Sequence, residues 1–456
     1  MKKETVLRWI PLVLLGLVAA AGLLVSPEKL VSRPGMVTGD IAWVMVASAL
    51  VFLMIPGLSF FYGGMVSRKN IISTMLQSFI ATGVISILWV VVGFSLVFGH
   101  SYHGIIGNPL TYFFFHHVLD GAPWKLAPTI PLLLFALFQM KFAIITPALV
   151  VGAIAERTQF KAYLLFMVLF SLFIYAPIAH WTWNPDGFLF KLGVLDFAGG
   201  TVVHISAGCA ALAGALALKR RKSHLEKRET QPANIPFVLL GTGLLWFGWF
   251  GFNAGSALAA NALAVSAFAT TTTATAAAGL SWLFFDSVRG RKPSALGFCI
   301  GAVVGMVAIT PAAGFVGIPQ SICIGFIAAI VSNLAVHWKS KSAVDDTLDV
   351  FPCHGIGGMT GMLLTGVFAS AAINGAGSNG WLYGNFTLFL HQALAMLLVT
   401  TYSFFMGWLI FKVVNLICPI RVTEQEEEIG LDLSQHDEQY HSGEELHVPP
   451  PVFEYV

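Results

Sequence analysis

The chain has 456 residues, of which 56% are hydrophobic and only 11% are charged, and its mean hydropathy is +0.78. Soluble domains carry about 25% charged residues, so this composition excludes an ordinary soluble protein and indicates a polytopic membrane protein. The formal net charge is only +2, and we find no basic cluster interleaved with aromatic residues. The sequence therefore predicts no nucleic-acid partner.

The cysteines give no sign of a disulfide framework or a metal site. None of them forms a CxxC pair or a pair of loop residues, and all lie in or at the end of apolar segments. We expect them to be small core residues, and we predict no metal ligands and no cofactor. The five cysteines are Cys209, Cys299, Cys323, Cys353 and Cys418.

Residues 1–25 begin with the basic residues Lys2, Lys3 and Arg8 and continue with an apolar run over 9–25. This pattern is typical of a cleavable signal peptide or of an extra N-terminal helix that is not cleaved. We favour the signal peptide, because the run is short for a membrane span and has three alanines, 19–21, near its end.

The chain from 38 to 417 reads as one all-α membrane domain, because it contains apolar runs long enough to cross a bilayer. We predict eleven such spans. They lie near 40–65, 71–98, 129–154, 162–183, 197–218, 236–257, 262–285, 294–311, 316–337, 350–369 and 388–415. Residues 418–456 are charged and end in a proline run, which is typical of a tail that is partly disordered toward its end.

The loop charges predict the topology, because basic residues gather in cytoplasmic loops. Only Lys125 and Lys191 depart from the alternation. We therefore predict a multi-pass protein of the cytoplasmic membrane with the mature N-terminus outside and the tail 418–456 inside. The basic residues of the alternate loops are Arg68, Lys69, Arg157, Lys161, Lys219, Arg220, Arg221, Lys222, Lys227, Arg228, Arg289, Arg291, Lys292, Lys339 and Lys341.

The first ten spans form two sets of five, so the second set enters the membrane from the opposite side. This arrangement is an inverted repeat, for which a site is expected at the midplane between the halves. The segment 196–208 places Asp196 at the start of the fifth span and His204 further in, and Asp349 and His354 repeat the order in the tenth. Ionisable groups at membrane depth are functional candidates, so we hypothesise that the two histidines form a proton relay. The alternative is two hydrogen-bonded core histidines on separate helices.

Other polar and aromatic residues allow two interpretations. Asp196 could cap its helix and could also lend a negative field to a cation site, whereas Asp345 and Asp346 read as solvated caps. Trp183, Phe142 and the aromatic run 246–256 suit a small cation held by cation–π attraction and one hydroxyl. The alternative for these aromatic residues is an ordinary interfacial belt.

Four stretches of the sequence, 56–64, 139–156, 196–208 and 248–256, together resemble the ammonium transporter family (Amt/Mep, related to the Rh proteins), in particular its bacterial Amt-type members. The resemblance extends from about residue 38 to residue 440. It implies eleven spans in an inverted 5+5 repeat, a homotrimer with one pore per subunit, and a transporter rather than an enzyme. No HExxH or GxSxG motif argues for an intramembrane enzyme.

The resemblance also implies roles for individual residues. The implied site for ammonium recruitment comprises Trp183, Ser256 and Asp196. The implied pore gate is the pair Phe142 and Phe252, and the implied pore lining with a proton relay comprises His204, His354 and Trp249. The implied regulatory tail segment, which could pack across subunits and receive a PII-type regulatory protein, is Gly430, Leu431 and Asp432.

The expected mechanism is capture of external ammonium, loss of a proton, and passage of ammonia through an apolar pore with the proton returned by the histidines. Two alternatives remain open: an ammonium sensor, or an electroneutral channel for ammonia or carbon dioxide of the Rh kind. The sequence differs from the usual pattern of the family at Lys141, next to Phe142, where an uncharged residue is expected. Since adjacent helix positions diverge by about 100°, we expect Lys141 to face a neighbouring helix, a subunit interface or water.

Overall fold

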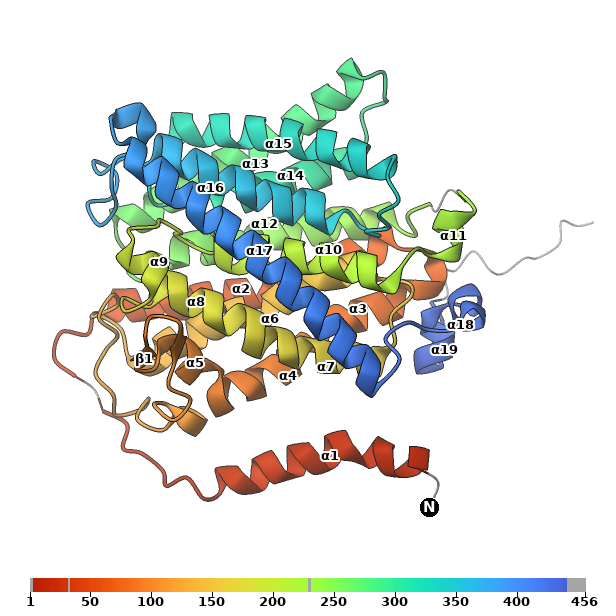
Figure 1. Ribbon diagram of the computed structural model, residues 1–456. Coiled ribbons are helices and arrows are strands. Elements are labelled where there is room, and N and C mark those ends of the chain that lie inside the picture. The colour runs from red at the N-terminus through yellow and green to blue at the C-terminus, as the bar shows by residue number, and fades with distance from the viewer. Residues whose placement is uncertain (1–2, 32, 229–230, 441–456) are drawn as a thin grey trace, which may run out of the picture.

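The computed structural model describes residues 3–31, 33–228 and 231–440, and in these residues long helices run side by side as a single bundle (Figure 1). The predicted tail therefore continues, over 441–456, outside the described residues. One end of the bundle carries the hairpin of β1 (Ser101–Tyr102) and β2 (Ile106–Gly107), which are antiparallel. The other end carries the tail helices α18 (Glu424–Ile429) and α19 (Leu431–His436), and we call these the hairpin end and the tail end.

The first half of the bundle is built from helices that are interrupted by short π segments. Its helices are α2 (Thr38–Met65), α3 (Ile71–Phe79), α4 (Ala81–Leu88), α5 (Phe94–Phe98), α6 (Leu132–Ile154), α7 (Phe160–Phe170), α8 (Ala176–Trp183), α9 (Phe188–Lys191) and α10 (Ser206–Leu218). The π segments are η2 (Trp89–Gly93), η4 (Ser171–Tyr175) and η5 (Gly200–Ile205), and short 3-10 turns are η1 (Arg68–Asn70) and η3 (Phe113–Phe115).

The short helix α11 (Lys222–Leu225) at the tail end connects the two halves. The elements of the second half are α12 (Ile235–Gly255), α13 (Ala262–Val288), α14 (Ala295–Ile309), α15 (Ile318–Ser340), η6 (Phe351–Ile356), α16 (Gly357–Phe368), η7 (Trp381–Tyr383) and α17 (Phe386–Ile417). Like η5, the segment η6 is a π-helix that leads directly into an α-helix.

Each of the eleven predicted ranges contains helix, and within the described residues nine helical runs are long and apolar enough to cross a membrane. The range near 294–311 corresponds to α14, which has only 15 residues. The range near 350–369 corresponds to η6 and α16, which are not among the nine. A polytopic helical bundle is thus established, and the count of eleven spans stays a prediction.

Local sequence signals start several of these helices. Asn234, Asn261 and Ser294 each accept a hydrogen bond from the backbone N–H three residues later, and so cap α12, α13 and α14. Thr423 and Glu426 form a capping box at α18. These caps satisfy backbone donors that have no partner within the helix.

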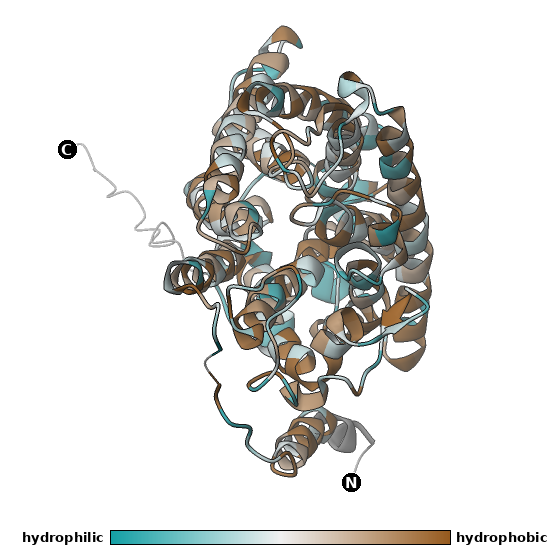
Figure 2. Ribbon diagram, turned by 90° about the vertical axis from the view of Figure 1, so that its left-hand side faces the viewer, coloured by the Kyte–Doolittle hydropathy of each residue, from teal (hydrophilic) through white to brown (hydrophobic). Residues whose placement is uncertain are grey.

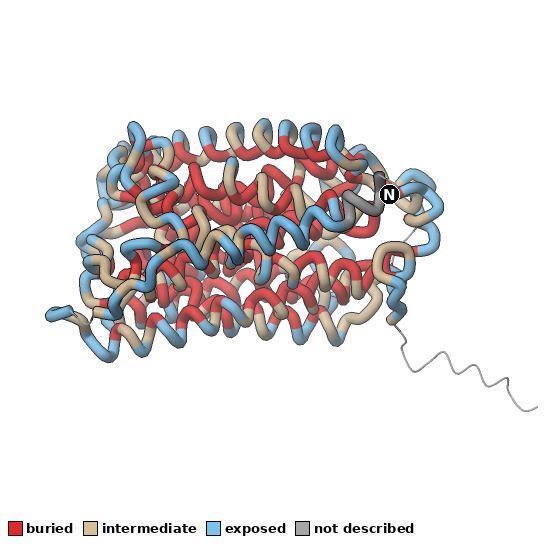
Figure 3. The backbone as a smooth tube through the Cα atoms, turned by 90° about the horizontal axis from the view of Figure 1, so that it is seen from below, coloured by how far each residue is buried: buried red, intermediate tan, exposed pale blue. Residues whose placement is uncertain are grey.

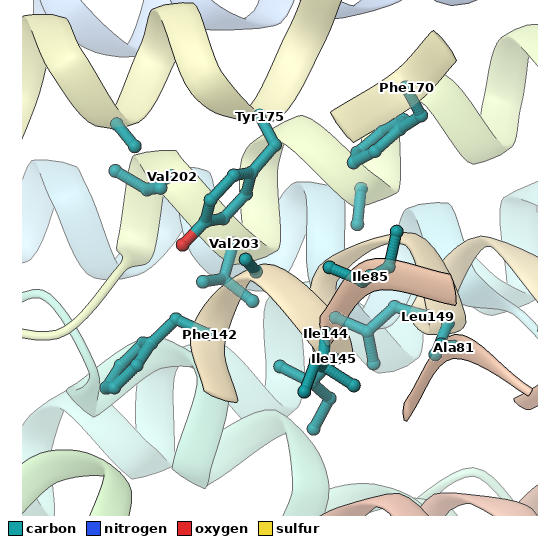
Figure 4. Close-up of a cluster of buried hydrophobic side chains, with 14 of the residues drawn as sticks. Ala81, Ile85, Phe142, Ile144, Ile145, Leu149, Phe170, Tyr175, Val202 and Val203 are labelled. Carbon is teal, nitrogen blue, oxygen red and sulfur yellow. The ribbon is translucent and has the colours of Figure 1, made fainter. Parts of the chain in front are cut away.

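The bundle buries an apolar interior and exposes apolar side chains on its outer faces, as expected for a protein that contacts lipid. Figure 2 looks along the helices from the hairpin end and shows hydrophobic residues over most of the ribbon. In the core, Figure 4 places Phe142 of α6 near Val202 and Val203 of η5 and Tyr175 of η4. These four side chains are all buried, which fixes η5 against the middle of α6.

The N-terminal helix α1 (Lys3–Gly22) lies along the outside of the bundle, where most of its residues from Trp9 onward are exposed (Figure 3). A linker from its end leads to α2 at the hairpin end. The helix fits both predictions made for residues 1–25, and whether the segment is cleaved stays a prediction.

Candidate functional site

Three cavities follow one another from the hairpin end into the bundle. A cavity of about 360 Å³ opens at the hairpin end, and we call it the vestibule. Below it are two cavities of only about 10 Å³ each, which share the lining residues Phe61, Val303 and His354. Since about 10–15 Å³ is needed to hold one water molecule, this passage is narrow. Most of the residues that line it are hydrophobic, and its ionisable members include His204 and His354.

The vestibule is lined mainly by aromatic side chains, together with a few polar groups. Trp183 and Ser256 both line it, and the Trp183 Nε1–H donates to the carbonyl of Asp196 at 3.0 Å. The Ser256 hydroxyl donates to the Phe252 carbonyl at 2.8 Å, which leaves its oxygen free to accept. The aromatic residues of the lining are Phe98, Trp124, Phe135, Phe142, Trp183, Phe190, Phe197 and Phe315.

Two phenylalanine rings separate the vestibule from the narrow passage. Phe142 lines the vestibule, Phe252 lines the passage, and their rings stack with centroids 4.2 Å apart and an interplanar angle of 27°. Trp183 meets the Phe142 ring edge-on at 5.6 Å. The stacked pair therefore blocks a hydrated ion at this point of the path.

Beyond the stacked rings, two imidazoles face each other in the passage. The Nδ1 atoms of His204 and His354 lie 3.3 Å apart, and the rings are 29° from parallel. Both side chains are buried, and His204 Nε2 has no hydrogen-bond partner among the described residues. Trp249 stacks beside His204 with centroids 5.4 Å apart and is fixed by a hydrogen bond from its Nε1–H to Thr310 Oγ1. The two imidazoles are therefore close enough to hydrogen-bond to each other through their Nδ1 atoms.

Equivalent aspartates position the two histidines. Asp196 accepts hydrogen bonds from the backbone N–H groups of Gly200 and Thr201 at 2.6 and 2.8 Å. Asp346 accepts from the corresponding groups of Val350 and Phe351 at 3.0 and 2.7 Å, with the same separations of four and five residues. Each carboxylate therefore caps the π segment that carries a histidine.

This pairing corrects two sequence interpretations. The counterpart of Asp196 is Asp346, which precedes His354 by the same number of residues as Asp196 precedes His204, and not the nearer Asp349. Asp345 and Asp346 are also not solvated caps, because they are only 2% and 1% exposed. Burial and the neighbouring Asp349 raise the pKa of Asp346, although Lys339 opposes this rise.

The two histidine segments cross where both lack side chains. A Cβ atom on Gly208 would lie 2.2 Å from the backbone nitrogen of Gly355, so neither segment could keep its place with a larger residue there. This close approach brings His204 and His354 to one passage, although they are 150 residues apart in the chain.

A buried charge cluster lies next to the second histidine segment at the tail end. Arg221 donates to both oxygens of Asp345, at 2.8 Å from Nη2 and 3.0 Å from Nε, and also to Glu156. Burial alone would raise the pKa of Asp345, but hydrogen bonds from Arg221 and the charge of Arg157 hold it well below its usual value. Burial lowers the pKa of the fully enclosed Arg157 to about 10.

The predicted regulatory segment packs against its own chain. Gly430, with a φ of 107°, lies against Lys69, and the Leu431 N–H donates to Asn70 Oδ1 at 2.8 Å. Asp432 accepts from the N–H groups of Ile72 and Ser73 in the first turn of α3. The tail is therefore held to the loop that follows α2.

Lys141 points away from the passage. Its Nζ lies 5.3 Å from the centre of the Phe52 ring on α2, and the side chain is half-buried. Lys141 is absent from the residues that line the vestibule and the passage. Its charge is therefore directed toward the outer face of the bundle and not toward the stacked rings.

The family is decided by comparison with known proteins, because the model of the Ammonium Transporter Family matches residues 42–441. The chain belongs to this family. It is 44% identical to the ammonium transporter Amt1 of Archaeoglobus fulgidus over 403 residues, which cover 88% of this chain and 99% of that protein. It is also 44% identical to an ammonium transporter of Bacillus subtilis over 412 residues, covering 88% and 98%.

Solved structures of the Ammonium Transporter Family have the same fold. The crystal structure of Candida albicans Mep2 matches with a TM-score of 0.81 and 36% identity, over 86% of this chain and 88% of that one. A structure described as a sensor Amt protein matches with a TM-score of 0.79 and 31% identity, over 87% and 98%. The resemblance in the sequence is thus confirmed at the level of the family.

Some residues of the site escaped the sequence analysis. Asp346 was missed although its spacing to His354 gave a usable signal. Trp124 of the vestibule comes from the loop between α5 and α6, whose path hydropathy does not predict. Gln139 and Thr182 also line the vestibule, and their buried Oε1 and Oγ1 atoms have no partner among the described residues.

Proposed function

We propose that this protein, like the ammonium transporters to which it is similar, moves ammonium across the cytoplasmic membrane. The observation that carries the proposal is the pair of imidazoles, 3.3 Å apart, in a narrow apolar passage below two stacked phenylalanine rings. A vestibule rich in aromatic faces suits a small cation, and the passage suits a small neutral molecule. The two imidazoles, which can accept a proton, line the passage beyond the stacked rings.

The order of steps follows from the free energy of desolvation. Ammonium binds in the vestibule between the rings of Trp183 and Phe142, with Ser256 accepting one of its hydrogen bonds. Moving the ion without water into the apolar passage would cost several kcal/mol, whereas neutral ammonia is transferred at far lower cost. The ion therefore gives up a proton to the His204 and His354 pair, ammonia moves past the stacked rings and along the passage, and the pair returns the proton to ammonia at the tail end. Potassium has no proton to release, so the same passage excludes it.

Asp196 supports recruitment from a distance. Its two oxygens are occupied by four hydrogen bonds of 2.8 Å or less from Gly199, Gly200 and Thr201, so direct coordination of ammonium is disfavoured. Its negative charge still contributes to the field at the neighbouring vestibule, which favours a cation. Asp196 thus both caps η5 and lowers the free energy of the captured ion.

For the assembly we infer eleven spans in an inverted 5+5 repeat, an N-terminus outside, a tail inside, and a homotrimer with one pore per subunit. The equivalent caps of η5 and η6 support the repeat, as does the packing of α2 on α12, the first long helix of each half. The basic residues of the alternate loops support the orientation. The segment 430–432 is fixed to the loop after α2 and to the start of α3. This ordered position is consistent with a regulatory tail that a PII-type protein could bind.

Two other functions make different predictions for transport. An electroneutral channel for ammonia would give flux without current, and a sensor would bind ammonium without significant flux. The vestibule that suits a cation argues against the neutral channel.

The test is current measured on solid-supported membranes with purified protein, using ammonium and potassium pulses. We expect ammonium currents in the wild type, none with potassium, and loss of the ammonium current in His204→Ala and in His354→Ala. His103→Ala, at an exposed loop residue, is the matched control and should leave the current unchanged. Unchanged currents in both pore variants would refute the relay, and ammonia flux without any wild-type current would favour the neutral channel.

A further inference from the structure

A cluster of metal-binding side chains lies at the hairpin end, outside the transport path. It forms where the linker after α1 meets the loop between α5 and α6. Glu28 comes from the linker, and His116 and His117 come from the loop. The Glu28 carboxylate lies 3.8 Å from His116 Nε2 and 3.9 Å from His117 Nδ1, and the three ligand atoms are all within 4.8 Å of one another.

The backbone holds these groups together. Glu28 accepts hydrogen bonds from the backbone N–H groups of His117 and Leu119. Phe114, Phe115 and His117 have φ values of 52°, 58° and 63°, a left-handed conformation that non-glycine residues rarely adopt. Such backbone strain concentrates at functional sites, and here it brings both imidazoles to the same carboxylate.

The ligand chemistry selects one class of ion. Two imidazole nitrogens and one carboxylate oxygen suit zinc and its neighbours among the divalent transition metals, whereas calcium and magnesium prefer oxygen ligands alone. Ligand atoms about 2.0–2.2 Å from a zinc ion lie roughly 3–4 Å from one another, close to the distances in this cluster. Asp120 Oδ1 also lies 3.9 Å from His117 Nδ1, but it does not belong to the group of three whose ligand atoms are all within 4.8 Å of one another.

We propose that Glu28, His116 and His117 form a binding site for a divalent transition metal ion, with zinc as the best fit. The two histidine side chains are 47% and 64% exposed, so an ion reaches them directly from solvent. Glu28 follows the predicted leader segment 1–25, so the site does not depend on whether that segment is cleaved. The proposal is also independent of the transport mechanism, because none of these residues lines the vestibule or the passage.

The ion would join the linker after α1 to the loop between α5 and α6. Arg33 of the same linker donates to the backbone carbonyl of Asp120, so the linker already follows this loop. The loop continues to Trp124, whose ring stacks on Phe135 at 5.4 Å in the wall of the vestibule. A bound ion would therefore fix the linker to one wall of the vestibule.

The test is zinc binding to the full-length protein, purified without a polyhistidine tag, stripped with EDTA and dialysed. We expect one zinc ion per chain by titration calorimetry and elemental analysis, and no displacement by a large excess of magnesium. His116→Ala, His117→Ala and Glu28→Gln should each weaken zinc affinity at least tenfold. His103→Ala removes another exposed histidine of the same loop and should bind zinc as the wild type does.

A spectroscopic measurement identifies the ligands. Copper(II) bound at the site should show electron paramagnetic resonance couplings to two imidazole nitrogens, reduced to one in either histidine variant. The proposal fails if the double variant His116→Ala/His117→Ala retains as much zinc as the wild type. It also fails if the wild type binds less than one zinc ion per chain under these conditions.

Discussion

The two segments that carry the pore histidines share one backbone design but differ in their surroundings. Asp196 and Asp346 each cap a π segment through N–H groups four and five residues later, and each segment presents a buried histidine. Around the first segment lie the vestibule and its aromatic rings. Around the second lie the buried charges of Asp345, Arg157 and Arg221.

This difference indicates what the repeat preserves. The geometry that places an imidazole in the passage is the same in both halves. The electrostatic surroundings of the two segments differ, because one lies beside the vestibule and the other beside the buried charges of the tail end. At the vestibule, Asp196 faces a cavity with room for a cation. At the tail end, Arg221 donates hydrogen bonds to both oxygens of Asp345, so this carboxylate is compensated within the protein.

The largest effect is expected from breaking the charge cluster beside the second segment. Asp345→Asn leaves the fully buried Arg157 without the carboxylate it pairs with, and leaves Arg221 with Glu156 alone. Removing one partner of a buried ion pair costs about 3–5 kcal/mol, so the free energy of unfolding should fall by that amount. Denaturant titration of the purified protein measures it. Asp186→Asn is the matched control at an exposed ion pair with Lys191, and it should change stability by less than about 1 kcal/mol.

The pH dependence of stability tests the same cluster. Because the folded-state pKa of Asp345 is held below its ordinary value of 3.8, its contribution is complete above pH 3.8 and is lost as the pH falls toward the folded pKa. The wild-type unfolding temperature should therefore drop as the pH is lowered below 3.8. Asp345→Asn should show a smaller drop, and an equal drop in both proteins would contradict the assignment.

A smaller effect should distinguish the two caps. Asp196→Ala removes the acceptor of three backbone N–H groups at 2.8 Å or less, of a fourth at 3.4 Å, and of the Thr201 hydroxyl. Asp346→Ala removes the acceptor of only two backbone N–H groups. Since a buried donor without a partner costs about 1–3 kcal/mol, we expect losses of at least about 3 kcal/mol for Asp196 and about 2 kcal/mol for Asp346. Equal unfolding midpoints in denaturant would show that the additional hydrogen bonds of Asp196 contribute little.

The helical bundle was largely predictable because the apolar runs in the sequence are long and recur along the chain. Each predicted apolar range contains helix, since only helices satisfy their own backbone groups in lipid. The interruption of the second range at Ile80, between α3 and α4, and the π segment η2 could not be predicted, because they follow from packing and not from hydropathy. Arg157 was taken for a loop charge, but it is fully buried by residues distant in the sequence.

The candidate site was predictable where a residue type is costly at membrane depth. The histidines stood out for this reason, and the structure brings His204 and His354 together. Asp346 was overlooked because proximity in sequence favoured Asp349, although equal spacing from the two histidines pointed to Asp346. The cluster of Glu28 with His116 and His117 required the path of a loop, and the sequence alone does not provide it.

The smallest expected effect concerns the position three residues after each cap, where both segments have a positive φ. The φ angle is 118° at Gly199 and 58° at Asp349. A Cβ atom on Gly199 would lie 2.7 Å from Val203 Cγ2, so Gly199→Ala should lower stability by about 2 kcal/mol through strain and crowding. Asp349→Gly relieves left-handed strain but loses an ion pair with Lys339 at 2.7 Å, so the net change should stay within about 1 kcal/mol.

Denaturant unfolding of both variants, with Asp349→Asn as the control, decides whether these positions are equivalent. Asparagine tolerates the left-handed conformation and removes only the charge, so Asp349→Asn reports the ion pair alone. Asp349→Gly could destabilise the protein more than both Asp349→Asn and Gly199→Ala. In that case the second segment needs the side chain at position 349, whereas the first segment needs a residue without a side chain at position 199. The two segments would then share the capping aspartate and the histidine but not the turn between them.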